Sequence, residues 1–317
     1  MKRFLSLALK AGVSIGLIWY ATRNLDFASA LDRLFSMPVW PLALAAAVWA
    51  CVLLNNTIRW RIVMKSLAAA LPFGQTFQIL YIGIFFNQVL PSSVGGDAVR
   101  MFLVYKTGVG VRPAVNSILL ERAATLLGLI LLVVATQPLL LSRIGDDPAR
   151  FAFPVLAVAA VAGIAFVMLL DRFPPAMQTW RIIRGIATLA EDTRRFFLKL
   201  KYSLPAIGLG FVGFSLISLL AFVLALGLDI DISLADCLVL IPPVMLVTTI
   251  PISVAGWGVR ETAMVFALGF AGVGEQEAVL LSLLLGVLMV VVALPGALLW
   301  LRSGHRRSDV AAGMPQA

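Results

Sequence analysis

Two arginines, Arg100 and Arg260, stand where long apolar sequence is broken by proline and glycine. The ten residues ending at each arginine read PSSVGGDAVR (91–100) and PISVAGWGVR (251–260), and six of the ten positions are identical. Proline and glycine interrupt helices, and a helix restarting at Asp97, a good N-cap residue, would present its amides and positive dipole end to an anion. An arginine in the first turn adds a bidentate grip on phosphate. The sequence therefore predicts an anion site at each motif.

The two motifs differ in the charges around them. Four ionisable residues have no ionisable counterpart 160 residues away: Asp97, Glu121, Arg122 and Glu261. An ion near the bilayer centre costs about 3 kcal/mol on insertion scales and marks a pathway or a pair by default. We predict that Arg122 joins Arg100 and Arg260 in binding a head group, and that the three carboxylates form salt bridges or couple transport to protons. Internal ion pairs that lock the two halves together are the alternative for Glu121 and Arg122.

Composition identifies the class of protein. The 317 residues are 61% hydrophobic and 13% charged, with a mean hydropathy of +1.00, far more apolar than a soluble domain. This predicts an all-α polytopic membrane protein, whose net charge of +9 belongs to loops rather than to a nucleic-acid surface. Cys51, Cys237 and the single His305 make neither a disulfide framework nor a metal cluster, so no metal or cofactor is expected. The sequence contains no HExxH and no phosphate-binding P-loop.

Hydrophobic runs divide the chain into spans. Six runs approach or exceed the length of about 20 residues that crosses a bilayer, and they cover 4–21, 39–56, 117–141, 151–170, 204–227 and 278–301. The runs 77–90 and 238–250 are too short, and each leads into one of the motifs. A short loop is expected between the first two spans, and Arg59 with Trp60 is expected to anchor the second span at the interface.

The distribution of positive charge selects a topology. If the two short runs are re-entrant, most of the 25 lysines and arginines face the cytoplasm, including those of 172–203. That segment has helical periodicity and aromatic residues, which favour an amphipathic helix on an anionic membrane surface over a solvated connector. If both short runs spanned fully, the same segment would lie outside, against the positive-inside rule. We therefore expect a multi-pass protein of the cell inner membrane with both termini cytoplasmic.

The same topology makes the chain an inverted repeat, because each half has two spans, a re-entrant loop and one span. The first repeat is expected at 1–150, with the re-entrant motif at 91–100. The second is expected at 151–301, with the amphipathic segment 172–203 and the re-entrant motif 251–261. Residues 302–317 would form a cytoplasmic tail.

Three stretches together resemble a known family. FNQVLPSSVGGDAVR, the ERAATLLGL that begins at Glu121, and PISVAGWGVRE resemble the membrane domain of lysylphosphatidylglycerol synthases, which also exists alone as flippase-like proteins. The resemblance covers nearly the whole chain and implies a lipid translocase fold with re-entrant inverted repeats. It implies functional positions in three groups. Those for the lipid head group are Arg100, Arg260, Arg122, Gly95, Gly96, Gly256, Gly258 and Asn87. Those for coupling or salt bridges are Asp97, Glu121 and Glu261, and the helix breaks are Pro91 and Pro251.

The expected function is translocation of a phospholipid or another anionic lipid between leaflets. The chain lacks the aminoacyl-transferase domain of the synthases, so we expect no enzyme activity from it. One alternative is a polyprenyl-phosphate carrier, which would use the same arginines. The other is a non-transporting protein that presents lipid to a partner, either a lipid-modifying enzyme or a glycosyltransferase.

Overall fold

The computed structural model describes residues 26–90, 95–144, 152–169, 181–249 and 256–303, together with a few single positions before residue 26. In these ranges the chain forms helices and no strand, as its composition predicts. Four helices are long and apolar enough to cross a membrane: α3 (Val39–Ser66), α6 (Val111–Ile144), α9 (Leu200–Gly227) and α12 (Glu275–Arg302). They contain four of the six predicted spans. The protein is therefore a multi-pass helical membrane protein.

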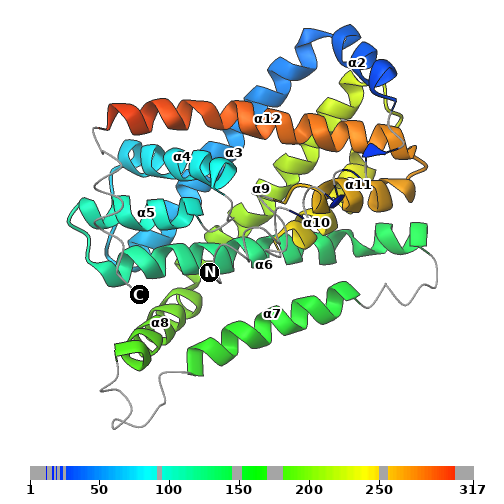
Figure 1. Ribbon diagram of the computed structural model, residues 1–317. Coiled ribbons are helices and arrows are strands. Elements are labelled where there is room, and N and C mark those ends of the chain that lie inside the picture. Colours follow the sequence, from blue (N-terminus) through cyan, green and yellow to red (C-terminus); the bar gives the residue numbers. More distant parts are fainter. Residues whose placement is uncertain are drawn as a thin grey trace.

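Four shorter helices carry the two motifs. They are α4 (Phe73–Val89), α5 (Gly95–Lys106), α10 (Leu234–Thr248) and α11 (Val259–Gly269). None has the roughly 20 residues that a perpendicular crossing needs. Instead, α4 packs on α5 and α10 packs on α11, so each motif lies at a break between two short helices. Figure 1 shows these two pairs well apart along α12, and each pair contacts both α12 and α6.

The packing is nearly unchanged when the helices of one half are exchanged for those of the other. α4 packs on α12 and α10 packs on α6, while α5 packs on α6 and α11 packs on α12. α3 and α9, both 28 residues long, pack against each other. A duplicated chain has this pattern, so the packing supports an internal repeat. The division at residue 150 and the opposite orientation of the halves in a membrane stay predictions.

A helix stands where the sequence suggested only a loop between the first two spans. α2 (Phe27–Ser36) begins after Asp26, whose Oδ1 accepts a hydrogen bond from the amide of Ala28 at 3.0 Å. This N-cap supplies the start signal, and the apolar residues that follow recur with helical spacing. The positions 160 residues later fall inside α8 (Arg181–Leu198), so α2 and α8 occupy equivalent places in the two halves.

Both of these helices are tied to the first turns of a long helix in the opposite half. Arg33 of α2 pairs with Glu277 of α12, with Nη1 2.9 Å from Oε1. Asp192 of α8 pairs with Arg112 of α6, with Oδ1 2.8 Å from Nη2. The carboxylate of Asp192 also accepts a hydrogen bond from Asn116 at 2.6 Å. The two connections are equivalent in position and opposite in polarity.

The remaining predicted segments are described in part. α7 (Ala152–Leu169) is the predicted fourth span, an apolar helix that packs on α6 and α8 at the edge of the molecule (Figure 1). α8 buries Ala190 and Phe196 completely, so its apolar face packs on neighbouring helices. Its predicted location on an anionic membrane surface stays untested. Most of the first span, residues 172–180 and the tail from 304 lie outside the described residues.

Candidate functional site

The first motif is held by a close approach of α5 to α4. The amide of Gly96 donates a hydrogen bond to Oδ1 of Asn87 at 2.9 Å. A Cβ at Gly96 would lie 2.0 Å from the carbonyl oxygen of Gly83, so glycine is required by space rather than by an unusual backbone angle. Gly95 begins α5, while Pro91 lies outside the described residues. These contacts fix the start of α5 against α4.

Asp97 does not cap α5, contrary to its predicted place at the start of the helix. α5 begins at Gly95, and Asp97 lies in the first turn with its side chain only 2% exposed. Its Oδ1 accepts from Nη1 of Arg100 at 3.2 Å, and its Oδ2 accepts from Nε of Arg122. A carboxylate in contact with two guanidinium groups gains more from these charge-assisted bonds than from a backbone amide. Asp97 thus forms ion pairs with both arginines, and its role in coupling or as a structural salt bridge stays a prediction.

Glu121 is the second carboxylate of the same network. Its Oε1 accepts two hydrogen bonds from Arg59, at 3.1 Å from Nε and 2.7 Å from Nη2. Its Oε2 accepts two from Arg100, both at 3.3 Å. The hydroxyl of Thr125 lies 3.3 Å from Oε1. Glu121 thus joins α3 to α5 through α6, and its side chain is 6% exposed.

Among the described residues, the network contains three cations and two carboxylates. Three guanidinium groups, those of Arg59, Arg100 and Arg122, share the carboxylates of Asp97 and Glu121. The guanidinium carbon of Arg100 also lies 4.1 Å from the centre of the Trp60 ring, which supports a cation without neutralising it. The Nε of Arg100 is buried and has no hydrogen-bond partner among the described residues. One further negative charge would balance these five described groups.

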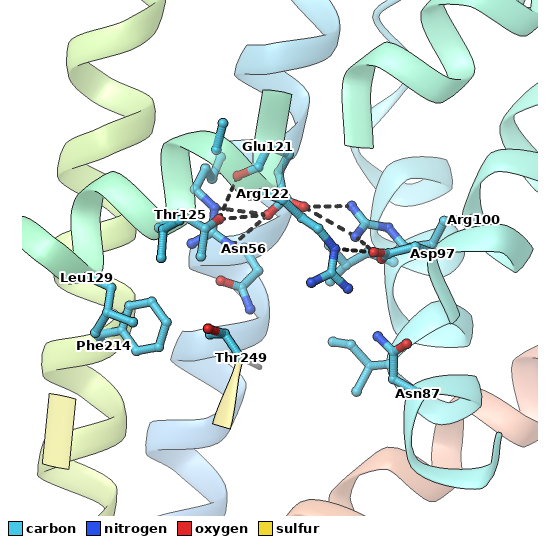
Figure 2. Close-up of a pocket in the computed structure, with 15 residues that line it drawn as sticks. Asn56, Asn87, Asp97, Arg100, Glu121, Arg122, Thr125, Leu129, Phe214 and Thr249 are labelled. Carbon is cyan, nitrogen blue, oxygen red and sulfur yellow. Dashed lines mark hydrogen bonds and ion pairs between the residues drawn. The ribbon is translucent and has the colours of Figure 1, made fainter. Parts of the chain in front are cut away.

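This network forms one wall of a cavity of about 480 Å³. Figure 2 shows the guanidinium of Arg122 pointing into the open space, with Asn87 and Thr249 across from it. The Arg122 side chain is about half exposed, whereas that of Arg100 is 8% exposed. Asn56, Thr125 and Asn87 add polar groups, and the remaining lining is mostly apolar. Its other lining residues are Arg59, Leu80, Ile84, Asp97, Arg100, Glu121, Ala123, Leu126, Leu129 and Phe214.

The second motif forms a compact cluster of its own. The Nη2 of Arg260 donates to Oε1 of Glu261 at 2.7 Å, and its Nε donates to the hydroxyl of Ser282 at 3.2 Å. The amide of Gly258 donates a hydrogen bond to Oε2 of Glu261 at 2.6 Å. This hydrogen bond caps the start of α11. Gly258 has a φ of 85°, a conformation that favours glycine. One cation and one carboxylate neutralise each other here, and Glu261 is fully buried.

The two motifs therefore differ more than their sequences suggest. Arg260, like Arg100, lies over a tryptophan, with its guanidinium carbon 4.8 Å from the Trp257 ring. A Cβ at Gly286 would lie 2.1 Å from the Arg260 guanidinium, so α12 closes over the arginine. Gly256 has a φ of 81° in the turn before α11, and Pro251 lies outside the described residues. Residues of the first motif line the cavity, whereas none of the described residues of the second motif, 256–260, is among its lining.

The structure divides the predicted site residues between these two places. Asn87, Gly96, Asp97, Arg100, Glu121 and Arg122 meet at the first motif, where all but Gly96 line the cavity. Arg260, Glu261, Gly256 and Gly258 belong to the second. The six ionisable residues expected around the two motifs thus form one cluster at each motif.

Arg59 is a site residue that the sequence interpretation placed elsewhere. It was expected to anchor α3 at the interface, but it is 5% exposed and bound to Glu121. Trp60 was expected beside it at the interface and is completely buried. α3 continues to Ser66, ten residues beyond the predicted span, which carries both side chains into the protein. The sequence did contain a signal for this location. If the helix continues past residue 56, Arg59 lies within it, and an arginine inside a membrane helix marks a functional site or an ion pair by default.

Comparison with known proteins finds one family whose model covers nearly the whole chain. A family model described as the lysylphosphatidylglycerol synthase TM region matches residues 7–296, which include both motifs and every helix from α2 to α11. No curated protein matches the chain. The matched region is the membrane region alone.

Proposed function

Because the chain belongs to the lysylphosphatidylglycerol synthase TM region family, we propose that it translocates an anionic lipid between the two leaflets of the cell inner membrane. The observation that carries this proposal is the charge balance at the first motif. Three guanidinium groups share two carboxylates on the wall of a cavity of about 480 Å³. The negative charge of a lipid phosphate would complete the balance.

The chemistry of the wall suits a phosphate oxygen. Arg122 points into the cavity, and Arg100 and Arg59 line the same cavity wall, so three guanidinium groups gather beside the space. Guanidinium groups recognise phosphate through two parallel hydrogen bonds, which fixes the orientation of the head group. An uncompensated charge inside a membrane protein is costly, and such residues mark substrate pathways by default. The three arginines on the cavity wall are therefore the groups that we propose bind the head group.

We further propose that the second motif serves the head group at another stage of transport. Inverted repeats with broken helices alternate between two arrangements around a central site. In the present arrangement Arg260 is occupied by Glu261 and Ser282, and the cavity is open at the first motif. In the other arrangement Arg260 would exchange these partners for the phosphate.

The proposed topology also agrees with the cross-connections between halves. α8 joins the start of α6, and in the proposed topology both lie on the cytoplasmic side with Lys106 and Arg302. α2 joins the start of α12, and both lie on the opposite side with the acidic residue Asp229. The positive-inside rule assigns the basic group to the cytoplasm.

The proposal is tested by leaflet exchange in reconstituted vesicles. Purified protein is placed in phosphatidylcholine vesicles that contain phosphatidylglycerol with a fluorescent chain, and the fraction accessible to an impermeant quencher is followed with time. Wild-type protein should accelerate exchange, and Arg122→Gln should slow it about tenfold, the effect of losing one charge-assisted bond of about 1.4 kcal/mol. The matched control is Arg302→Gln at the end of α12, which is remote from the cavity lining and should leave the rate unchanged.

The other outcomes identify the alternatives. Equal exchange in wild-type and Arg122→Gln vesicles would refute the role of the cluster. Lipid binding without exchange would favour the lipid-presenting protein, above all if a lipid-modifying enzyme or a glycosyltransferase co-purifies. Mass spectrometry of lipids that co-purify with the protein separates a phospholipid from a polyprenyl phosphate.

A further inference from the structure

An apolar groove lies directly beside the polar cavity. It has a volume of about 250 Å³ and is formed by the facing sides of α6, α7 and α8. Ala123 and Leu126 of α6 line both the groove and the polar cavity, so the two spaces share a wall. A second apolar space of about 310 Å³ continues from it and shares Leu127, Ile164 and Phe197. The polar and apolar spaces therefore adjoin each other along α6, at Ala123 and Leu126.

The groove stays open because α7 presents small residues to α6. A Cβ at Gly163 would meet nothing within 4 Å, and Ala160 lies one turn earlier on the groove side of the same helix. α7 contacts α6 and α8 and lies at the edge of the molecule (Figure 1). Val158 and Phe166 of α7 are mostly exposed, as expected for a lipid-facing helix. A molecule in the bilayer can thus reach the groove from the side.

We infer that this groove holds a hydrocarbon chain of the same lipid whose anionic group occupies the polar cavity. The inference rests on the proposed function and adds the second half of the binding site. A charged cavity that shares a wall with an apolar groove has the two-part shape of an amphiphile. This arrangement predicts that the lipid enters sideways between α6 and α7. Its head group would then pass Ala123 and Leu126 toward Arg122.

The groove selects by shape rather than by hydrophobicity. A chain that leaves the bilayer for the groove exchanges one apolar environment for another, so it gains little from the hydrophobic effect. What the groove provides is close packing against small side chains, together with an attachment to the head-group site. Filling the space at Gly163 should therefore exclude the chain, whereas an equal change on another lipid-facing surface should have no effect.

The test uses phosphatidylglycerol that carries a photoreactive diazirine in one acyl chain. It is a minor component of phosphatidylcholine nanodiscs that contain the full chain, and unlabelled phosphatidylglycerol is the competitor. After illumination, labelled peptides are identified by mass spectrometry. We expect labelling of α7 near Gly163 and of α6 near Leu127 that the competitor removes. Labelling of α9 near the exposed Gly208 reports surrounding bilayer lipid and should resist competition.

Two substitutions match each other in chemistry. Gly163→Trp fills the groove, and Gly208→Trp places the same side chain at a helical glycine that also has open space around it. Gly163→Trp should abolish the competable labelling and Gly208→Trp should preserve it. Ala160→Phe is a second filling variant, and unfolding midpoints verify that all three proteins are folded. Arg122→Gln should also reduce labelling in the groove, because the head group no longer retains the lipid.

Labelling of α7 that resists competition as labelling of α9 does would overturn the inference, as would unchanged labelling in both filling variants. Leaflet exchange measured on the same proteins separates this inference from the proposed function. Competable labelling without exchange supports the chain site and contradicts translocation. Exchange without competable labelling supports translocation and contradicts the chain site.

Discussion

Removing the charge of Glu121 should destabilise the protein strongly while increasing its response to anionic lipid. The carboxylate of Glu121 accepts four hydrogen bonds from Arg59 and Arg100, at 2.7 to 3.3 Å. Glu121→Gln preserves the size of the side chain but leaves two buried guanidinium groups with less compensation. Breaking a buried ion pair from one side costs about 3–5 kcal/mol. Because the amide oxygen still accepts a hydrogen bond, we expect a loss near the lower end, about 3 kcal/mol.

The control is the same substitution in an exposed ion pair of similar length. Glu277 pairs with Arg33 at 2.9 Å, but the two side chains are 33% and 48% exposed. Exposed pairs contribute about 1 kcal/mol or less, so Glu277→Gln should change stability little. The two substitutions are the same in chemistry and the shortest N–O distances are similar, so the comparison tests burial together with the number of arginine partners.

The assay is the thermal unfolding midpoint in one detergent, measured with and without added phosphatidylglycerol. Glu121→Gln raises the excess charge of the cluster from one to two, so the anionic lipid should bind more tightly and restore more stability than in the wild type. Phosphatidylcholine should not restore it. Equal losses in the two variants, or a Glu121→Gln protein as stable as the wild type, would refute the argument that a buried and unbalanced network forms the site.

Three further substitutions test other parts of the structure. Arg122→Gln should lower stability by only about 1 kcal/mol, because its side chain is half exposed, and unfolding of this variant should no longer respond to anionic lipid. Gly96→Ala should cost about 1–3 kcal/mol through overpacking against α4, whereas Gly74→Ala, where a Cβ has open space, should be neutral or stabilising in the same unfolding assay. Asp192→Asn should weaken the attachment of α8 to Arg112 and speed amide hydrogen exchange in α8 specifically.

Each of these three predictions would be contradicted by a specific result. A full lipid response in Arg122→Gln would place the anion elsewhere. Equal stability of the Gly96→Ala and Gly74→Ala proteins would mean that the α4–α5 contact is looser than described. Unchanged exchange in α8 after Asp192→Asn would show that apolar contacts alone hold this helix.

Local sequence was sufficient for the secondary structure and the class of protein. Apolar runs located the four long helices, because helix in a membrane satisfies every backbone polar group within the segment. Two boundaries were missed: α3 continues ten residues beyond its predicted span, and α6 begins six residues before its own. Proline and glycine marked the breaks before Gly95 and before Val259, since both residue types interrupt helices through their own backbone chemistry. The repeat was visible because duplicated motifs keep their spacing. The missed helix α2 is short, and its cap at Asp26 is a weaker signal than a long apolar run.

The identity of the site depended on tertiary structure. Arg59 and Glu121 are 62 residues apart in sequence, and no local pattern states that α3 and α6 bring them to 2.7 Å. Asp97 could cap a helix or join two arginines, and the choice depends on the side chains that α6 presents to it. The same applies to Arg260, which a neighbouring glutamate neutralises, while the Nε of Arg100 has no hydrogen-bond partner in the part of the chain that the structure describes. The sequence alone determined that two arginines follow two helix breaks in a membrane protein. Only the packing of helices decided which of them stands beside a cavity, because charge balance and empty space belong to surfaces that meet across long separations in the chain.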